Sequence, residues 1–250
     1  MKEVGYDRST VTVVILARNE SQSIAAVVRS ASEWCGTVLV MDGRSTDGTA
    51  EVAREAGARV FQDEGKGKGS AIRQSLSLCD TDFVVFMDAD GSHDAADIEA
   101  LVTPVAHHGA DLCVGSRFAG GSDELSVNTS QLIRTIGNIL MNIAINKRWG
   151  VELTDTLNGY RAVRRAAALS VGLEEDTHTI EQEMVMKFLR HGFVVMNAPT
   201  HEYKREFGAS HIRIWIEWPK FVWCVVRNIV VTDKVKVLRE DKARVPAPAE

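Results

Sequence analysis

The sequence predicts an α/β fold, in which helices cover both faces of a mostly parallel sheet. In the first half of the chain, short runs rich in β-branched residues alternate with amphipathic stretches of helical length. This alternation is typical of strand–helix–strand units with a parallel sheet. In such sheets ligands bind at the carboxyl ends of the strands.

The predicted elements follow one another in a regular order in the first half and less regularly afterwards. Strands are expected at residues 11–16, 37–41, 59–62, 83–87 and 111–115, with helices near 23–33, 49–56, 69–78 and 97–107. The second half predicts a helix at 130–149, a short strand at 160–163, a helix at 180–191 and a strand at 193–198. We expect one domain over residues 1–211, an amphipathic helical segment over 212–240 and a disordered tail over 241–250.

Composition narrows the class of protein. The 250 residues are 45% hydrophobic and 25% charged, which is enough for one large core. A net charge of −5 argues against a nucleic-acid partner. The four cysteines lack metal-ligand spacing, so free thiols and a cytoplasmic location are expected. No signal peptide and no run of about 20 apolar residues is seen, so any membrane contact is expected to be peripheral.

Two acids, Asp88 and Asp90, stand at the carboxyl end of the apolar run FVVFM. In extended backbone, residues two apart point to the same side, so both carboxylates are expected to converge on one cation. Oxygen ligands favour Mg²⁺ or Mn²⁺, which usually brings substrate phosphates as further ligands. The alternative, of about equal weight, is a loop whose acids are solvated or cap the next helix.

Two other segments at strand ends carry weaker signals. Asp42 either accepts hydrogen bonds from a nucleobase or ribose, or only caps its turn. In DEGKGKGSAIRQSL, Lys66 and Lys68 alternate with glycines ahead of a helix, a pattern typical of phosphate contact and also of a solvated loop. Neither a Walker A motif nor a dinucleotide glycine fingerprint is present.

The order of these segments resembles family 2 glycosyltransferases of the dolichol-phosphate-mannose synthase type. The resemblance rests on ILARNE, VLVMDGRSTDGTAEVA, GKGKGSAI, VVFMDADGSHDAADI, LCVGSRF, DTLNGYRAVRR and REFGASH, over roughly residues 11–211. It implies a glycosyltransferase A-type (Rossmann-like) fold and inverting transfer of a hexosyl unit from a UDP- or GDP-sugar with Mg²⁺ or Mn²⁺. The nucleotide half would span about 9–117 and the acceptor half about 118–211.

The same resemblance implies roles for individual residues. Asp90 would be the direct metal ligand, with Asp88 nearer the ribose and Ser92 as a further contact to the metal. Contacts to the nucleotide sugar are implied for Ala17, Asn19, Glu20, Asp42, Lys66, Asp88, Ala89, Arg117, Arg134 and Arg205. Arg117, Arg134 and Arg205 would balance a diphosphate and an anionic acceptor. The sequence departs from the family pattern at Arg18, Gly43 and Asn158.

Two hypotheses for the function differ in the acceptor, and a third proposes no transfer at all. A polyprenyl (dolichyl-type) phosphate is already anionic and needs no strong base. A hydroxyl of a soluble molecule or polysaccharide needs a carboxylate base, for which Asp155, Glu181 and Glu183 are candidates, each with a structural alternative. The predicted catalytic residues are Asp90, Asp155, Arg117 and Glu183. An inactive nucleotide-sugar-binding module is the alternative of another class, and a nucleotidyltransferase is disfavoured because no glycine-rich loop follows the first strand.

The segment at 212–231 is rich in Ile, Val and Trp. Glu217, Pro219 and Arg227 make it too polar and too interrupted to span a bilayer. Its tryptophans predict either an interfacial belt that touches membrane or lipid, or packing against the domain or against a second copy in a homodimer.

Overall fold

The structure, a computed structural model, describes residues 4–123, 129–205 and 214–230. Its centre is a sheet in the spatial order β3-β2-β1-β4-β6-β5-β7. The strands are β1 (Val11–Ala17), β2 (Thr37–Asp42), β3 (Arg59–Gln62), β4 (Phe83–Asp88), β5 (Leu112–Ser116), β6 (Arg161–Arg164) and β7 (Val195–Pro199). Only β6 runs antiparallel to its neighbours among these strands, so the predicted mostly parallel sheet is confirmed.

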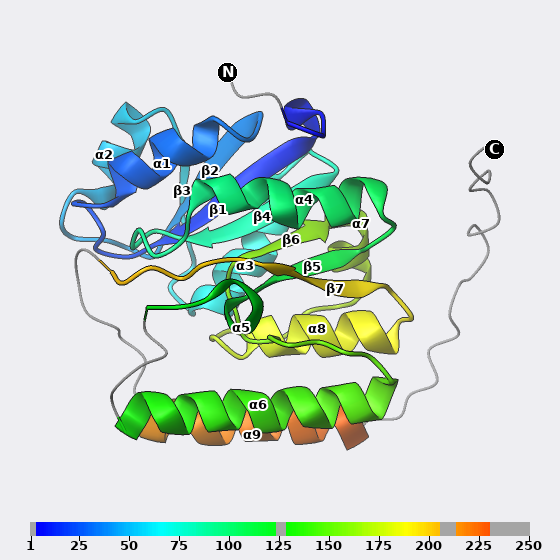
Figure 1. Ribbon diagram of the computed structural model, residues 1–250. Coiled ribbons are helices and arrows are strands. Elements are labelled where there is room, and N and C mark those ends of the chain that lie inside the picture. The colour runs from blue at the N-terminus through cyan, green and yellow to red at the C-terminus, as the bar shows by residue number, and fades with distance from the viewer. Residues whose placement is uncertain (1–3, 124–128, 206–213, 231–250) are drawn as a thin grey trace, which may run out of the picture.

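The helices lie on both sides of this sheet (Figure 1). They are α1 (Ile24–Ser32), α2 (Thr49–Glu55), α3 (Lys68–Leu78), α4 (Ile98–His107), α5 (Arg117–Gly120), α6 (Thr129–Trp149), α7 (Arg165–Ser170), α8 (Ile180–Arg190) and α9 (Ile214–Val230), with 3-10 turns η1 (Arg8–Thr10) and η2 (Ala95–Asp97). Each strand and helix predicted before residue 200 is present within one or two residues of its predicted ends. The short helices α5 and α7 carry too few residues for a periodic pattern and were not predicted.

Two hydrophobic clusters, one on each face, hold the helices to the sheet. Alternate residues of β1 point to opposite faces, so Val13 and Ile15 join the cluster with α1 and α4, whereas Val14 joins the cluster with α3 and α8. All three side chains are fully buried. Burial on both faces explains why β1 reads as a continuous apolar run rather than an alternating one.

The long helices α6 and α9 lie side by side beneath α8 (Figure 1). Gly137 of α6 allows this close approach, because a Cβ built there would lie 1.7 Å from a ring carbon of Trp218 in α9. One of the tryptophans of the 212–231 segment therefore packs against the domain. None of the helices in the described part of the chain combines the length and apolar character that a membrane span requires.

The glycine-rich start of α3 makes a backbone contact with the loop before α8. The backbone N–H groups of Gly69 and Ser70 donate to the Asp176 carbonyl, at 2.8 and 3.3 Å. A Cβ on Gly69 would lie 2.2 Å from the Glu175 carbonyl oxygen. These contacts bring the loop before α8 against the start of α3, and they give both N–H groups a hydrogen-bond partner. These two N–H groups are therefore not available for the phosphate contact that was one of the two expectations for this segment.

Candidate active site

All seven strands direct chain segments to one edge of the sheet. The parallel strands β1, β2, β3, β4, β5 and β7 end there, and β6 begins there because it runs the opposite way. A cleft of about 240 Å³ opens at this edge, lined by Leu16, Ala17, Arg18, Glu20, Met41, Gly43, Asp63, Lys68, Ala71, Asp88, Ala89, Asp90, His93, Arg117, Leu157, Asn158, Gly159, His178, Glu181, Glu202 and Arg205. The lining contains six carboxylates and four Lys or Arg side chains, so its excess of negative charge would favour the binding of an additional cation.

Lys68 holds two carboxylates on the floor of the cleft. Its Nζ lies 2.7 Å from Asp88 Oδ1 and 2.7 Å from Glu181 Oε1, and 13% of the Lys68 side chain is exposed. Burial favours the neutral form of each group, but the pairing outweighs it, so the pKa of Lys68 is raised and that of Asp88 is lowered. Gly159 makes room for this cluster, because a Cβ there would lie 2.8 Å from Lys68 Nζ.

Asp90 lies beyond the strand, in a turn. Its Oδ1 accepts from the Ser92 backbone N–H at 3.0 Å and from the Ser92 hydroxyl at 2.6 Å, while its Oδ2 lies 3.0 Å from Arg205 Nε. The prediction that Asp88 and Asp90 converge on one cation does not match these contacts, because each has a cation of its own. The physical reason is that β4 ends at Asp88 and the chain bends at Ala89 and Asp90, so the backbone between the two acids is no longer extended.

A divalent metal fits Asp90 better than the pair of acids. Asp90 Oδ2 already accepts a positive group, the Arg205 guanidinium, and Ser92 fixes the orientation of the carboxylate. Within the described residues there is no group of three or more His, Cys, Asp or Glu side chains that could hold a metal. The chemistry suits Mg²⁺ or Mn²⁺, which bind through one or two carboxylates together with waters and substrate phosphates.

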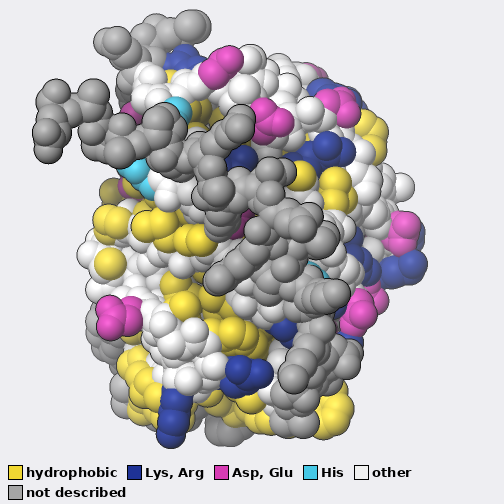
Figure 2. Space-filling view, turned by 90° about the vertical axis from the view of Figure 1, so that its right-hand side faces the viewer, with side chains coloured by type: hydrophobic (Ala, Val, Ile, Leu, Met, Phe, Trp, Pro, Cys, Tyr) yellow, Lys and Arg dark blue, Asp and Glu magenta, His cyan; other side chains and the backbone are white. Residues whose placement is uncertain are grey.

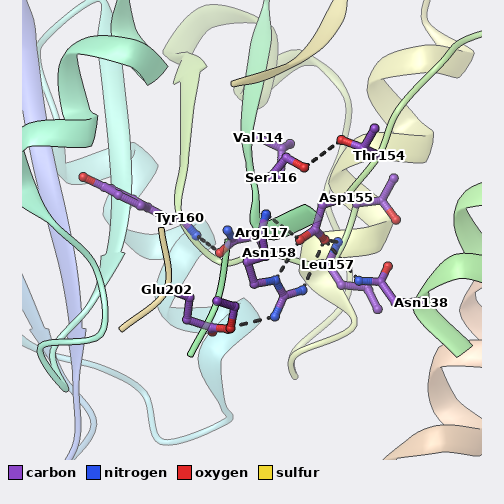
Figure 3. A network of polar contacts seen from close by, with 12 residues as sticks. Val114, Ser116, Arg117, Asn138, Thr154, Asp155, Leu157, Asn158, Tyr160 and Glu202 are labelled. Atoms are coloured by element: carbon purple, nitrogen blue, oxygen red, sulfur yellow. Dashed lines mark hydrogen bonds and ion pairs between the residues drawn. The ribbon is translucent and has the colours of Figure 1, made fainter. Parts of the chain in front are cut away.

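Arg117 is fixed in the cleft by a buried carboxylate. Figure 3 shows Arg117 between Asp155 and Glu202, with Arg117 Nε 2.7 Å from Asp155 Oδ2 and NH1 3.7 Å from Glu202 Oε1. Asp155 is 0% exposed and also accepts from Asn138 Nδ2 and from the Leu157 backbone N–H. Burial would raise the pKa of Asp155, but Arg117 outweighs it and the pKa is lowered. Asp155 is therefore a positioning residue for Arg117 and does not line the cleft as a base would.

Asp42 lies at the end of β2 with one carboxylate oxygen unused. Oδ2 accepts from the Ser45 backbone N–H at 3.1 Å, whereas the buried Oδ1 has no hydrogen-bond partner among the described residues. A buried acceptor without a partner is unfavourable, so the site suits a ligand that donates an N–H or O–H. Asp42 itself is 3% exposed and lies next to Met41 and Gly43, which line the cleft.

The turn after β1 joins Asp42's neighbours to the cleft. Asn19 donates its backbone N–H to Ser45 Oγ at 2.9 Å and accepts from the Thr46 backbone N–H at 2.9 Å. Its φ of +56° lies in the left-handed region, which Asn tolerates better than most residues. Asn19 thus clamps two loops together, while Ala17, Glu20 and Ala89 line the cleft as the sequence predicts.

Two further predicted residues, Lys66 and Glu183, do not line the cleft. Lys66 pairs with Glu64 in solvent, at 2.7 Å, and does not line it. Glu183 is buried against Lys187 and the backbone N–H groups of Glu174 and Glu175. Arg134 lies in α6 outside the residues whose side chains the structure describes, and residues 206–211 of the REFGASH segment also lie outside the described part of the chain.

Sequence reasoning missed several lining residues, above all His178 and Glu202, and it named Lys68 only together with Lys66, as part of a loop typical of phosphate contact or of solvation. The signal for Lys68 was its place as the first residue of α3, two positions after the exposed Lys66. The His93 ring stacks on Tyr160 with centroids 4.5 Å apart, and His93 Nδ1 accepts from the Asp88 backbone N–H at 3.3 Å. His93 therefore supports the turn after β4 that carries Asp90. No spacing pattern signalled His178 or Glu202.

Known proteins resemble this chain over most of its length. The family described as Glycosyl transferase family 2 matches residues 12–172. Glycosyltransferase AglJ of Haloferax volcanii is 34% identical over 194 residues, which make up 77% of this chain and 62% of the relative, so the match spans less than two thirds of that protein. Dolichyl-phosphate hexose transferase of the same organism is 26% identical over 210 residues, 83% of this chain and 88% of the relative.

Solved structures share the fold. Glucosyl-3-phosphoglycerate synthase from Mycobacterium tuberculosis, in complex with Mn²⁺, uridine diphosphate and glucosyl-3-phosphoglycerate, is similar with a TM-score of 0.69 and 21% identity. The similarity covers 93% of this chain and 88% of that chain. At this level of identity the likeness concerns the fold alone, and it confirms the predicted glycosyltransferase A-type architecture.

The Lys68 cluster predicts a specific pH dependence of stability. In Lys68→Met, Asp88 and Glu181 lose their cation, so we expect a loss of about 3 kcal/mol at pH 7, the lower end for a broken buried pair because 31% of the Asp88 side chain is exposed. The lowered pKa of Asp88 stabilises the fold fully above the unfolded pKa of about 3.9, and this contribution is lost progressively as pH falls from there toward the lower pKa of the folded state. Urea unfolding from pH 7 to pH 3 should show the difference between wild type and variant shrinking.

Lys66→Met is the matched control, because it removes the same charge from an exposed pair. It should leave the free energy of unfolding close to that of wild type at every pH, because an exposed ion pair contributes little to stability. An equal loss in both variants would contradict the buried role of Lys68.

Proposed function

Because the chain belongs to glycosyl transferase family 2, we propose that it is a metal-dependent inverting glycosyltransferase that moves a hexosyl unit from a UDP- or GDP-sugar to a polyprenyl phosphate. The observation that carries this proposal is the single cleft into which the strands direct Asp88, Asp90, Arg117 and Arg205, next to the buried Asp42. The unit spanning 1–211 would be catalytic, with the nucleotide bound by its first half and the acceptor by its second.

The donor end is supported by Asp42. Its buried Oδ1 without a partner suits a base N–H or a ribose hydroxyl, the groups that a nucleoside offers. The similar glucosyl-3-phosphoglycerate synthase was solved with uridine diphosphate. These two observations favour UDP, and Asp42 would read the nucleoside while Glu20 and Asp88 line its path toward the phosphates.

The diphosphate would be held by cations on two sides. Asp90, oriented by Ser92, would hold Mg²⁺ or Mn²⁺, which when bound stabilises the negative charge that develops on the departing diphosphate. Arg117 presents a guanidinium whose position is fixed by Asp155, so it needs little reorganisation during the reaction. Arg205, which also lines the cleft, adds a second guanidinium.

The acceptor proposal rests on how the carboxylates are used. Among the described residues, each carboxylate that lines the cleft takes part in a hydrogen bond or ion pair: Glu20, Asp63, Asp88, Asp90, Glu181 and Glu202. A strong general base needs an available carboxylate or histidine near the acceptor oxygen. An acceptor that is already ionised removes this need. A relative of this chain carries the name dolichyl-phosphate hexose transferase, which supports a lipid phosphate.

We further propose that α6 and α9 bring the enzyme to a membrane surface. Large apolar side chains are exposed on both helices: Ile136, Ile139, Leu140, Ile143, Val222, Trp223 and Val226, with Trp223 at 65% and Leu140 at 60%. The two helices carry five basic residues and one acid, against a net charge of −5 for the chain. Figure 2 shows hydrophobic and basic side chains together low on the molecule, at the level of α6 and α9 in Figure 1.

A bilayer is favoured over a second copy of the chain because like charges on two such faces would repel, whereas anionic lipid attracts them. The cytoplasmic side of the membrane remains our proposed location. The four cysteines are free and buried, in keeping with a reducing compartment.

A nucleotide panel tests the donor. With Mn²⁺ present, UDP, GDP, CDP and dTDP should raise the thermal midpoint to different extents, with UDP or GDP giving the largest increase by mass action. Asp42→Asn should reduce that increase, because an amide nitrogen replaces one of the two acceptor oxygens. Glu51→Gln, a change on the exposed surface of α2, is the control and should respond like wild type. Equal responses in Asp42→Asn and wild type would contradict the role of Asp42.

An acceptor assay tests the reaction. Turnover of the preferred UDP- or GDP-sugar should occur with polyprenyl phosphate in detergent, and Asp90→Asn should lower it by about 100-fold, as expected for loss of a preorganised electrostatic contact. Asp80→Asn, an exposed carboxylate after α3, should keep wild-type turnover. Transfer to soluble alcohols with none to lipid phosphate would favour the hydroxyl alternative. No transfer to either acceptor would favour an inactive binding module.

Vesicle sedimentation tests membrane contact. The pair Leu140→Ser and Trp223→Ser should lose most of the binding to vesicles that contain anionic phospholipid, and high salt should weaken binding of wild type. Leu169→Ser is the control, because Leu169 is 47% exposed on α7, away from these helices. Unchanged binding of the double variant, or its conversion from dimer to monomer, would assign the two helices to another role.

A further inference from the structure

Among the three arginines that line the cleft, Arg117 and Arg205 each pair with an acid, and these two ion pairs differ in strength. Arg117 contacts Asp155 through both Nε and NH2, at 2.7 and 3.2 Å, and Asp155 is fully buried. Arg205 contacts Asp90 Oδ2 through Nε at 3.0 Å, and 30% of its side chain is exposed. A two-point contact to a buried carboxylate is fixed, whereas a one-point contact to a more exposed guanidinium is easier to break.

The backbone places Arg205 beside Asp90. The Tyr203 backbone N–H donates to the Ser92 carbonyl at 2.8 Å, and His93 and Glu202 form an isolated antiparallel bridge. The segment that carries Arg205 therefore runs along the turn that carries Asp90. Because two neighbouring residues are tied by backbone hydrogen bonds, the Arg205 pair is a feature of the fold rather than a chance contact of a long side chain.

Asp90 has one oxygen to offer to a cation. Its Oδ1 already accepts two hydrogen bonds from Ser92, and its Oδ2 is the oxygen that contacts Arg205. The Asp90 side chain is 6% exposed, so leaving it without a positive partner would be costly. A metal ion on Asp90 Oδ2 and the Arg205 guanidinium therefore need the same place.

We propose that Arg205 is a resident counter-cation of Asp90 that a divalent metal must displace. In the absence of metal, Arg205 neutralises the buried carboxylate and keeps the acid turn in its folded geometry. When the metal binds, Arg205 leaves Asp90 and its guanidinium becomes available to the diphosphate in the same cleft. By linkage, Arg205 lowers the affinity of the cleft for metal alone, and metal binding raises the affinity for an anion at Arg205. This inference rests on the proposed metal dependence.

Metal binding in the absence of nucleotide tests the exchange. Mn²⁺ is titrated against wild type, Arg205→Gln, Arg205→Lys and Lys204→Gln, and free Mn²⁺ is read from its electron paramagnetic resonance signal. Arg205→Gln should bind Mn²⁺ at least about 5-fold more tightly than wild type, the lower end of couplings between two sites. Lys204→Gln removes the same charge one residue earlier from an exposed side chain, and it should match wild type. Arg205→Lys keeps a competing cation and should stay close to wild type.

A stability measurement covers the case in which Arg205→Gln folds poorly without metal. Saturating Mn²⁺ should raise the thermal midpoint of Arg205→Gln by more than that of wild type, because the metal then supplies the missing charge. Equal Mn²⁺ affinity in wild type and Arg205→Gln would overturn the exchange while leaving the metal assignment intact. No Mn²⁺ binding by either protein, with or without UDP, would overturn both proposals.

Discussion

The arrangement of this protein depends on the cost of burying carboxylates at one edge of a sheet. Parallel strands end together, so their terminal acids come close to one another and away from water. Several acids at this edge are paired with a cation: Lys68 holds Asp88 and Glu181, Arg205 holds Asp90, and Arg117 holds Asp155, which does not itself line the cleft. Lys68, Arg117 and Arg205 thus stabilise the fold by pairing with these acids in the absence of substrate. A charged substrate that binds here would have to compete with, or add to, these existing ion pairs.

The sheet and the position of the cleft could be predicted from sequence because both follow from local pattern. Apolar runs fixed the strands, and the rule that ligands bind at strand ends placed Asp42, Asp88 and Asp90 at the right edge. The family assignment was likewise confirmed, because several motifs occurred in the expected order. These inferences required only residue type, spacing and order along the chain.

The partners of the acids could not be predicted in the same way. Lys66 and Lys68 look alike in sequence, but α3 begins at Lys68 and turns it toward β4, whereas Lys66 stays in solvent. Glu181 and Glu183 share a helix, yet two positions rotate a side chain by about 200°, so only Glu181 faces the cleft. Asp155 was predicted as a candidate base, but in the structure its carboxylate accepts hydrogen bonds from Arg117, Asn138 and the Leu157 backbone N–H. Such distinctions depend on packing between distant segments.

Helix α6 has two tasks that its sequence cannot separate. Asn138 donates to Asp155 from the inner side of this helix, while Ile136 and Ile139 on adjacent positions are exposed. Since Asp155 fixes Arg117, a rotation of α6 about its own axis would move the guanidinium that faces the cleft. An engineer who replaces the outer isoleucines to improve solubility must therefore preserve the rotation of α6. The hydrogen bond from Asn138 to Asp155 thus connects α6, whose outer side chains are exposed, to the carboxylate that orients Arg117.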